Sequence, residues 1–472
     1  MATSGSKLYA RSLLYRTLVM MKLSRMELSW LPYALPCVIV WSVYLLSFFP
    51  GIMSPDSIEQ WKQLLEFKFV DVHPVFHTLT NWLITRVWLS PAAIAFSQII
   101  ALAIVFGLTM RELELMHVPR WARITITLAF SLSPVNGFMS ITLWKDVPFT
   151  IALLALWMLL LRIVCTNESA LVSSRFLIAL TVVLVAVSLY RHNGLPVVAL
   201  IIVTLWWLFK DHRKRIVLTG VAWAAVFFFV KIGLNGLLRV APAPAAFVYM
   251  LPIHQVVALR QSTPLTYEEA QLLDSMAQPD FWNFYRCSVP NAAIYLNSGP
   301  YAGQFDQDFF ARHTNDFSRV WLALAMRNPR PLVEHQVCLT SMLWRVMPLP
   351  GSYLYTVPLG IDRNDMGLVT QSLLPQMQTL LSDVYEWSMS PAISWWFWRP
   401  ALHLCLVLAI LLLVRFERRD VVLLLSVPLF QSLVLLLLIA GQDTRYQYPV
   451  YVIALIAPGL LFAKKIPVVS KV

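Results

Sequence analysis

The chain has 472 residues, of which 58% are hydrophobic and only 13% are charged, whereas a soluble domain has about 25% charged residues. This composition excludes an ordinary soluble protein and indicates an integral membrane protein. The formal net charge of +12 is explained by Lys and Arg side chains facing anionic lipid head groups, so it gives no reason to expect a nucleic-acid partner.

The apolar segments are about 16 to 20 residues long, which suits helices crossing roughly 30 Å of hydrocarbon and is too long for the strands of a membrane barrel. The sequence therefore predicts an all-α polytopic membrane protein. About ten segments are predicted to be transmembrane helices: 32–49, 92–110, 122–140, 147–163, 175–190, 195–210, 216–234, 397–414, 420–440 and 446–462.

Lys and Arg are distributed unequally between the two sides that these segments define. Of the 37 Lys and Arg residues, 20 fall in segments on the side of the N-terminus, and six fall in short loops on the opposite side. Short cytoplasmic loops carry an excess of Lys and Arg in membrane proteins. We therefore expect a cytoplasmic N-terminus and an opposite, outer face that contacts the extracytoplasmic space.

The same segments divide the chain into regions. Residues 1–31 are a basic lead-in that suits the inner membrane surface. Residues 32–234 form a transmembrane module, and residues 397–472 contain the C-terminal transmembrane helices. Between them, residues 235–396 are rich in Asp, Asn, Gln, Pro and Tyr and are long enough for an independent domain. Helix-capping patterns and the lack of strand-like alternation predict a mainly helical outer domain there.

The first outer loop, residues 50–91, is too long to be a simple turn. Its second half, residues 75–89, has helical periodicity, with four apolar residues on one face: Phe76, Leu79, Leu83 and Val87. We expect an amphipathic helix that lies along the membrane surface.

Cysteine is sparse in this sequence, with five residues. Only Cys287 and Cys338 fall in the predicted outer domain, where they can form a disulfide if that side is oxidising, although spacing alone does not establish proximity. Neither a Cys-x-x-Cys motif nor a His/Cys cluster indicates a structural metal.

Two polar positions of the first outer loop are candidates for chemistry. Asp56 follows the first predicted span in a Pro- and Gly-containing segment that can hold it at the membrane surface; alternatively, it caps a helix beginning at Ser57, with Glu59 three residues later. His73 precedes Pro74 and is either a general base or metal ligand, or part of a hydrogen-bonded turn before a helix.

The second outer loop, residues 141–146, contains a charged pair in otherwise apolar sequence. Lys145 and Asp146 stand where one predicted span ends and the next begins. They provide a phosphate-binding lysine and a second acid for the same outer face. The alternative is a helix cap with a local ion pair, because the N-terminus of a helix favours an anion.

Two later loops carry arginines on the same face. Arg191 and Asn193 lie in the tight turn 191–194, where a snorkelling arginine is the alternative explanation. In the loop 441–446, Arg445 offers planar, bidentate recognition of a phosphate. Two neighbouring aromatic residues can line a channel for a sugar or a lipid: Tyr446 and Tyr448.

These features together resemble the GT-C class of membrane glycosyltransferases. The resemblance rests on Asp56 just after the first span, a surface helix behind it, a Trp-Lys-Asp turn at 144–146, an outer domain late in the chain and an Arg-Tyr-x-Tyr-Pro segment at 445–449. Within that class the chain looks closest to bacterial enzymes that modify cell-envelope glycans or lipids. Many members carry two adjacent acids in the first loop, whereas Asp56 stands alone here.

The resemblance implies transfer of one sugar from a polyprenyl-phosphate donor to an envelope glycan or lipid acceptor at the outer face, usually with inversion. Asp56 matches the catalytic base, and Asp146 matches a second-loop acid that orients the acceptor or binds a divalent metal. Three cations are candidates for the leaving lipid phosphate: Arg445, Lys145 and Arg191. The remaining candidates are predicted to bind substrate: His73, Glu59, Tyr446, Tyr448 and Asn193. Of these, Glu59 and His73 can also share the role of the base.

Other classes remain open from sequence. A flippase or transporter for lipid or polysaccharide is expected to carry charged residues within its spans, which are nearly free of charge here. A membrane acyl- or phosphotransferase is expected to have a nucleophile–base pair, for which the histidines are scattered candidates. The favoured interpretation remains a multi-pass enzyme of the bacterial inner membrane, surrounded by membrane lipids, with its active site on the periplasmic side.

Overall fold

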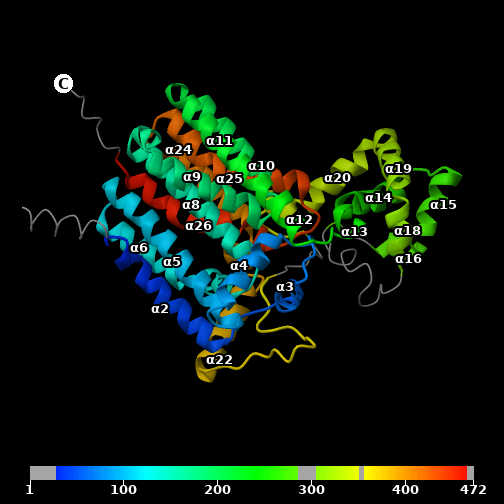
Figure 1. Cartoon of the computed structure of the whole chain (residues 1–472), viewed down its shortest axis with the longest axis horizontal. Coiled ribbons are helices and arrows are strands. Elements are labelled where there is room, and N and C mark those ends of the chain that lie inside the picture. The colour runs from blue at the N-terminus through cyan, green and yellow to red at the C-terminus, as the bar shows by residue number, and fades with distance from the viewer. Residues whose placement is uncertain (1–27, 285–286, 288–303, 350–355, 465–472) are drawn as a thin grey trace, which may run out of the picture.

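A computed structural model describes residues 28–284, 287, 304–349 and 356–464. Within these ranges the regular elements are helices, and a few isolated β-bridges pair single residues of segments that are distant in the sequence. The predicted all-helical class is therefore confirmed for the described part of the chain. Figure 1 shows a bundle of long helices, with a group of shorter helices gathered to one side of it.

Helices occupy each of the predicted apolar segments. The bundle consists of α2 (Leu31–Ser47), α5 (Pro91–Leu115), α6 (Arg120–Leu132), α7 (Pro134–Ile141), α8 (Asp146–Cys165), α9 (Ser174–Tyr190), α10 (Gly194–Leu208), α11 (Arg213–Phe228), the π-helical η3 (Phe229–Leu234), α12 (Asn235–Leu237), α24 (Pro400–Leu413), α25 (Arg418–Leu438), α26 (Tyr448–Ile456) and η6 (Ala457–Phe462). Short 3₁₀ turns join some of them: η1 (Ser169–Val172), η2 (Lys210–His212) and η5 (Thr444–Gln447).

Several of these helices are long and apolar enough to cross a membrane. Among the described residues there are four: Pro91–Leu115, Asp146–Cys165, Lys210–Leu237 and Arg418–Leu438. The pair α6 and α7, bent by 54°, makes a fifth if it forms one span. The bend falls at Pro134, which has no backbone N–H to continue the α6 hydrogen bonds. The chain is thus a helical membrane protein.

Helix α8 lies at the centre of the bundle, and α11 lies at its edge. In its most apolar stretch, 72% of α8 is buried, against 17% for the helix that begins at Lys210. The α8 indole of Trp157 donates to the carbonyl of Leu424 in α25, which satisfies its buried N–H. The turn from α9 to α10 requires Gly194, because a Cβ there would meet the carbonyl oxygen of Val187 at 2.0 Å.

The first loop forms α3 (Pro55–Glu66) and α4 (Val75–Thr85), so the predicted surface helix is present but ends earlier than expected. Its polar side chains, His77, Thr78 and Asn81, are buried against the protein. Leu83, on the other face, is 65% exposed. This orientation turns the apolar face outward, as suits a helix in contact with lipid.

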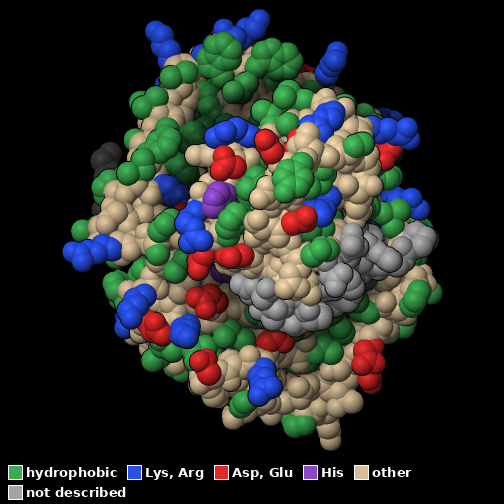
Figure 2. Space-filling view, turned by 90° about the vertical axis from the view of Figure 1, so that its right-hand side faces the viewer, with side chains coloured by type: hydrophobic (Ala, Val, Ile, Leu, Met, Phe, Trp, Pro, Cys, Tyr) green, Lys and Arg blue, Asp and Glu red, His purple; other side chains and the backbone are tan. Residues whose placement is uncertain are grey.

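The smaller group of helices we call the helical domain. It consists of α13 (Ala245–Val248), α14 (Met250–Ser262), α15 (Tyr267–Met276), α16 (Pro279–Phe284), α18 (Gln307–Arg312), α19 (Thr314–Arg327), α20 (Pro329–Leu339) and α21 (Ser341–Trp344). Helices α13 to α19 share an aromatic core, whereas Leu339 of α20 and Leu343 of α21 pack with Leu435 of α25. Thr266 and Glu269 form a capping box at the start of α15. Figure 2 looks at this side of the molecule: hydrophobic side chains gather towards the top, and acidic and basic side chains are mixed across the middle.

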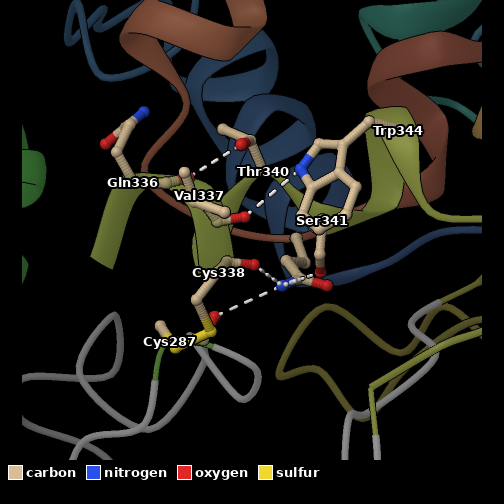
Figure 3. The surroundings of a disulfide bond; sticks show 8 residues. Cys287, Gln336, Val337, Cys338, Thr340, Ser341 and Trp344 are labelled. Carbon is tan, nitrogen blue, oxygen red and sulfur yellow. Dashed lines mark hydrogen bonds between the residues drawn. A yellow bond between two sulfur atoms is a disulfide. The ribbon is translucent and has the colours of Figure 1, made fainter. Parts of the chain in front are cut away.

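The described residues of the predicted outer domain, 235–396, pack in two places. The last part of this domain, with α22 (Pro375–Met389) and α23 (Ser394–Trp398), packs against the bundle. The Tyr385 ring meets Phe138 of α7 edge-on at 5.1 Å, a favourable aromatic geometry that joins α22 to the bundle. Cys287 and Cys338 are joined by a disulfide, which ties the segment after α16 to α20 (Figure 3).

Candidate functional site

Backbone hydrogen bonds join the first and second outer loops. The N–H of Ile52 donates to the carbonyl of Ile141 at 3.0 Å, and the N–H of Leu143 donates back to Ile52 at 3.0 Å. Side chains reinforce this pairing: the indole of Trp144 donates to Ser54 Oγ at 2.6 Å. The two acids predicted from sequence therefore belong to loops that are held side by side.

Asp56 is not the N-cap residue of a helix, which was the alternative that the sequence left open. Helix α3 begins at Pro55 with Ser54 as its N-cap residue, so Asp56 lies in the first turn of the helix, not at its cap. Asp56 faces two groups from other loops, Arg445 Nη1 at 3.0 Å and Lys145 Nζ at 3.7 Å, and one from its own loop, His73 Nε2 at 3.9 Å. Its side chain is 32% exposed, so it meets solvent as well as these partners.

The positive charges around Asp56 set its protonation. Burial raises the pKa of the Asp56 carboxyl group, but Arg445 and Lys145 outweigh burial and hold that pKa well below its ordinary value. The carboxylate is therefore ionised at neutral pH. With Arg445 and Lys145 against it the carboxylate is a weak base, because these cations disfavour its protonation.

Asp146 is the buried counterpart of Asp56. It is the first residue of α8, and its side chain is 1% exposed. It forms an ion pair with Arg191 Nη1, and its other oxygen lies 3.8 Å from Arg445 Nε. Because one carboxylate meets both arginines, Asp146 sets their relative positions.

Lys145 and His73 contact each other at the edge of the site. Lys145 Nζ lies 2.8 Å from His73 Nδ1, so the ammonium donates and the ring nitrogen accepts. Burial, followed by the positive charge of Lys145, lowers the His73 pKa to about 3, so the ring is neutral with its proton on Nε2 towards Asp56. Burial also lowers the pKa of Lys145 to about 7.

Aromatic rings hold the two arginine side chains. The guanidinium of Arg445 lies over the Trp144 ring at 4.6 Å, and Tyr446 lies within 5.5 Å of Arg445 and 4.5 Å of Arg191. Such contacts stabilise a guanidinium without neutralising it. Arg191 Nε also donates to Asn193 Oδ1 at 2.9 Å. The cations are thus positioned while their charge is retained.

Two residues of the site were not predicted. Asp443 accepts from Arg445 Nε at 2.7 Å, and burial raises its pKa. Gln431 of α25 accepts from Asn193 at 3.3 Å and donates to the carbonyl of Tyr446 at 2.8 Å. The available signal for Gln431 was a polar residue inside an apolar span, which is typically functional or positioning.

Two of the predicted residues lie elsewhere. Glu59 is exposed on α3, where its carboxylate accepts from Gln63 of the same helix at 3.2 Å. Tyr448 is buried inside the bundle, and its hydroxyl donates to Asn136 Oδ1 at 3.1 Å. In the described part of the chain, no three His, Cys, Asp or Glu residues are grouped as metal ligands.

Cavities open on both sides of the cation cluster. One, of about 280 Å³, is lined by polar and apolar side chains together, which include Lys145, Arg191, Asn193, Tyr446, Leu435 and Leu438. A second is mostly apolar and borders Arg445, Met139 and Trp398, but its free volume of about 20 Å³ holds no more than about one water molecule. The first cavity therefore offers both cationic and apolar side chains to a molecule bound beside the cluster.

Part of the chain is similar to a known family. Residues 72–243 match the model of a family of unknown function, DUF6020. This region runs from α4 to α12 and contains His73, Lys145, Asp146 and Arg191 of the site. No curated protein and no solved structure matches the chain.

Proposed function

We propose that the protein is a GT-C-type glycosyltransferase that transfers one sugar from a polyprenyl-phosphate donor to a glycan or lipid acceptor. The observation that carries this proposal is the convergence of Arg445, Lys145 and His73 on Asp56, beside a cavity lined by both cationic and apolar side chains. An acid and several cations beside such a cavity suit a reaction in which a lipid phosphate is the leaving group.

The membrane arrangement that accompanies this function has ten spans, with the N-terminus in the cytoplasm and the site at the extracytoplasmic surface. The four long helices and the bent pair account for some of these crossings. The shorter apolar helices supply the others: Leu31–Ser47, Ser174–Tyr190, Gly194–Leu208, Pro400–Leu413 and the α26–η6 segment. The excess of Lys and Arg in the opposite loops supports this orientation.

In the proposed reaction the acceptor oxygen attacks the anomeric carbon of the sugar. The acceptor O–H bond breaks and its proton passes to the carboxylate of Asp56. The bond between the anomeric carbon and the phosphate oxygen breaks, and its electron pair remains on the lipid phosphate. Arg445, Lys145 and Arg191 stabilise that developing charge, and Asp146 keeps the two arginines aligned.

Binding of the donor would also prepare the base. Arg445 and Lys145 lie against Asp56 and lower its pKa. A donor phosphate adds a negative charge and takes part of the interaction of both cations, so the pKa of Asp56 rises towards its ordinary value. Asp56 is then a stronger base in the presence of donor than in its absence.

The test is substitution of the base, with the neighbouring acid as a control. Asp56→Asn keeps the size of the side chain and removes its basicity, so we expect sugar transfer to fall about 10²- to 10⁴-fold. Glu59→Gln, one turn away and exposed, should retain transfer. The measurement is the mass of envelope glycolipids and lipopolysaccharide from cells with each variant. Wild-type modification by a normally inserted Asp56→Asn protein would refute the assignment.

A further inference from the structure

Some large apolar side chains of the helical domain are exposed on its surface and do not pack into its core. Large apolar side chains, each at least 48% exposed, occupy α19, α20, α21 and the segment just after α21, and we call them the apolar strip: Leu322, Met326, Val333, Val337, Trp344 and Met347. The two in α19 are four residues apart, as are the two in α20. Side chains with this spacing lie on one face of a helix, so each helix presents an apolar face outward.

The opposite face of α20 already forms its contacts within the protein. Pro331, His335 and Leu339 are buried. Val333 and Val337 therefore do not belong to the core of the helical domain, and solvation of the strip in water would leave a large apolar patch exposed. Contiguous patches of this kind mark a binding surface.

The position of α20 shows which part of the bundle this helix adjoins. Gln336 Nε2 donates to the carbonyl of Leu436 in α25 at 2.7 Å, and Leu339 packs in one cluster with Leu435. Figure 3 shows the side chains of Gln336 and Cys338 on opposite sides of α20, so this contact with α25 and the disulfide hold the helix from both sides. The orientation of the strip relative to α25 is thereby set.

Helix α25 is one of the four helices able to cross the membrane. Its last residues, Leu437 and Leu438, are 60% and 58% exposed, as expected for side chains that face lipid. Because α20 is bonded to this end of α25, the helix that carries Val333 and Val337 adjoins the lipid-facing end of α25. In Figure 1, α20 leads away from the bundle, so the helical domain lies beside the bundle.

The residues around the strip suit the boundary between lipid tails and head groups. Trp344 is 48% exposed, and tryptophan is enriched at membrane interfaces. Arg319 and Arg330 each precede a strip residue by three positions, and their side chains are 80% and 86% exposed; each also pairs with an acid of its own helix, Asp316 at 3.3 Å and Glu334 at 2.7 Å. Long cationic side chains beside apolar ones can bury their stems and keep their charge among lipid phosphates.

We propose that the apolar strip is a membrane-binding surface, which lies in the head-group and upper acyl region of the leaflet that meets the C-terminal end of α25. The helical domain is then anchored to the bilayer beside the bundle and is not suspended in water. On the buried face of α20, the cluster that contains Leu339 and Leu435 also packs against Tyr446, so the anchored domain is in direct contact with the site.

The test uses the full chain in nanodiscs of phosphatidylglycerol and phosphatidylcholine. Cys405, the exposed free cysteine among the described residues, is first replaced by Ser, and the disulfide is kept. Bimane is then attached at Val337→Cys or, in a second protein, at Val333→Cys. The matched control is Ser275→Cys, an exposed position on α15 of the same domain. Each label is titrated with iodide in the water phase and, separately, placed in nanodiscs with brominated acyl chains.

We expect brominated lipid to quench the labels at 333 and 337 about twofold or more, and iodide to quench them several-fold less than the label at 275. Iodide quenching equal to that of the control would place the strip in water and overturn the proposal. Protection from both quenchers would mean that a second copy or another protein covers the strip, which would also overturn it. The two labelled positions are independent, so failure of one variant to fold leaves the other decisive.

Discussion

The two ends of helix α8 carry ion pairs of different kinds. At its C-terminal end, Arg162 pairs with Glu112 of α5, and the arginine side chain is 38% exposed. At its N-terminal end, Asp146 is 1% exposed and meets two arginines, of which Arg445 also contacts Asp56. The first is a pair between neighbouring helices with access to water. The second is a buried cluster assembled from four loops.

This difference indicates that the two ends of α8 have different roles. An ion pair with an exposed partner adds little to stability and tolerates the loss of one member. Buried charges lose hydration, so a cluster of them is costly unless every charge is compensated. A chain that needed only stability could fill the N-terminal end of α8 with apolar side chains. Retention of charge there is consistent with a binding role for an anion, as proposed above.

The largest contrast is expected from loss of an arginine at each end. Arg445→Ala removes the cation nearest Asp56 and should lower donor use about 10²- to 10³-fold, with little change in the KM of the acceptor. Arg162→Ala, at the other end, should leave transfer unchanged. The measurement is the initial rate of transfer against donor and acceptor concentration. Equal losses for donor and acceptor in Arg445→Ala would favour a structural role for this arginine.

Replacement of the acid at each end of α8 should lower the free energy of unfolding by different amounts. Asp146→Asn leaves Arg191 and Arg445 without their shared buried partner and should destabilise the protein by about 3 to 5 kcal/mol. Glu112→Gln should cost about 1 kcal/mol or less, because Arg162 can turn to water. The midpoint of thermal unfolding in nanodiscs measures both. A smaller loss for Asp146→Asn than for Glu112→Gln would contradict the comparison.

The cluster should also respond to pH in a way that the other end does not. Burial lowers the pKa of Lys145 to about 7, so the side chain is a cation below this pH and becomes neutral as pH rises through it. Binding of a polyprenyl phosphate should therefore weaken above about pH 7, by at most about tenfold per pH unit.

Lys145→Arg supplies the control, because an arginine stays protonated over this range. Its binding should be nearly independent of pH between 6 and 9. The measurement is the dissociation constant of the lipid phosphate across this range. An unchanged pH dependence in Lys145→Arg would show that another group titrates.

The smallest effect is expected from Gln431→Leu in α25. The substitution removes the bond that Asn193 donates and the bond to the carbonyl of Tyr446, without touching a charge. We expect a loss of about 1 kcal/mol in stability and a severalfold loss in donor affinity, because the Arg191 loop and the Arg445 loop are no longer tied together. Ser426→Ala, in the same helix, provides a control. A larger effect in the control would rule out a positioning role for Gln431.

Much of the site could be predicted from the sequence because its residues interrupt apolar segments. Asp56, Lys145, Asp146, Arg191 and Arg445 are conspicuous at the ends of spans, and all of them meet in the structure. A charge at such a place is rare enough to attract notice without any knowledge of its partners. The helical class and the surface helix followed from hydrophobic periodicity in the same way.

Other features depended on contacts that no local pattern records. Asp443 stands two residues before Arg445, yet its ion pair became apparent only in the folded loop. Glu59 has the right chemistry and spacing for a second acid, but it points to Gln63 and the solvent. The disulfide between Cys287 and Cys338 joins residues 51 positions apart, a proximity that spacing cannot establish.

The sequence by itself determined the class of the protein, the positions of its apolar helices and the identity of most charged residues at their ends. These follow from composition and periodicity, which are properties of single segments. Tertiary structure decided which charges meet, that Asp146 lies between two arginines, that the polar face of α4 turns inward, and that α22 joins the bundle. These depend on the packing of distant segments, whose relative positions are set by the whole set of contacts.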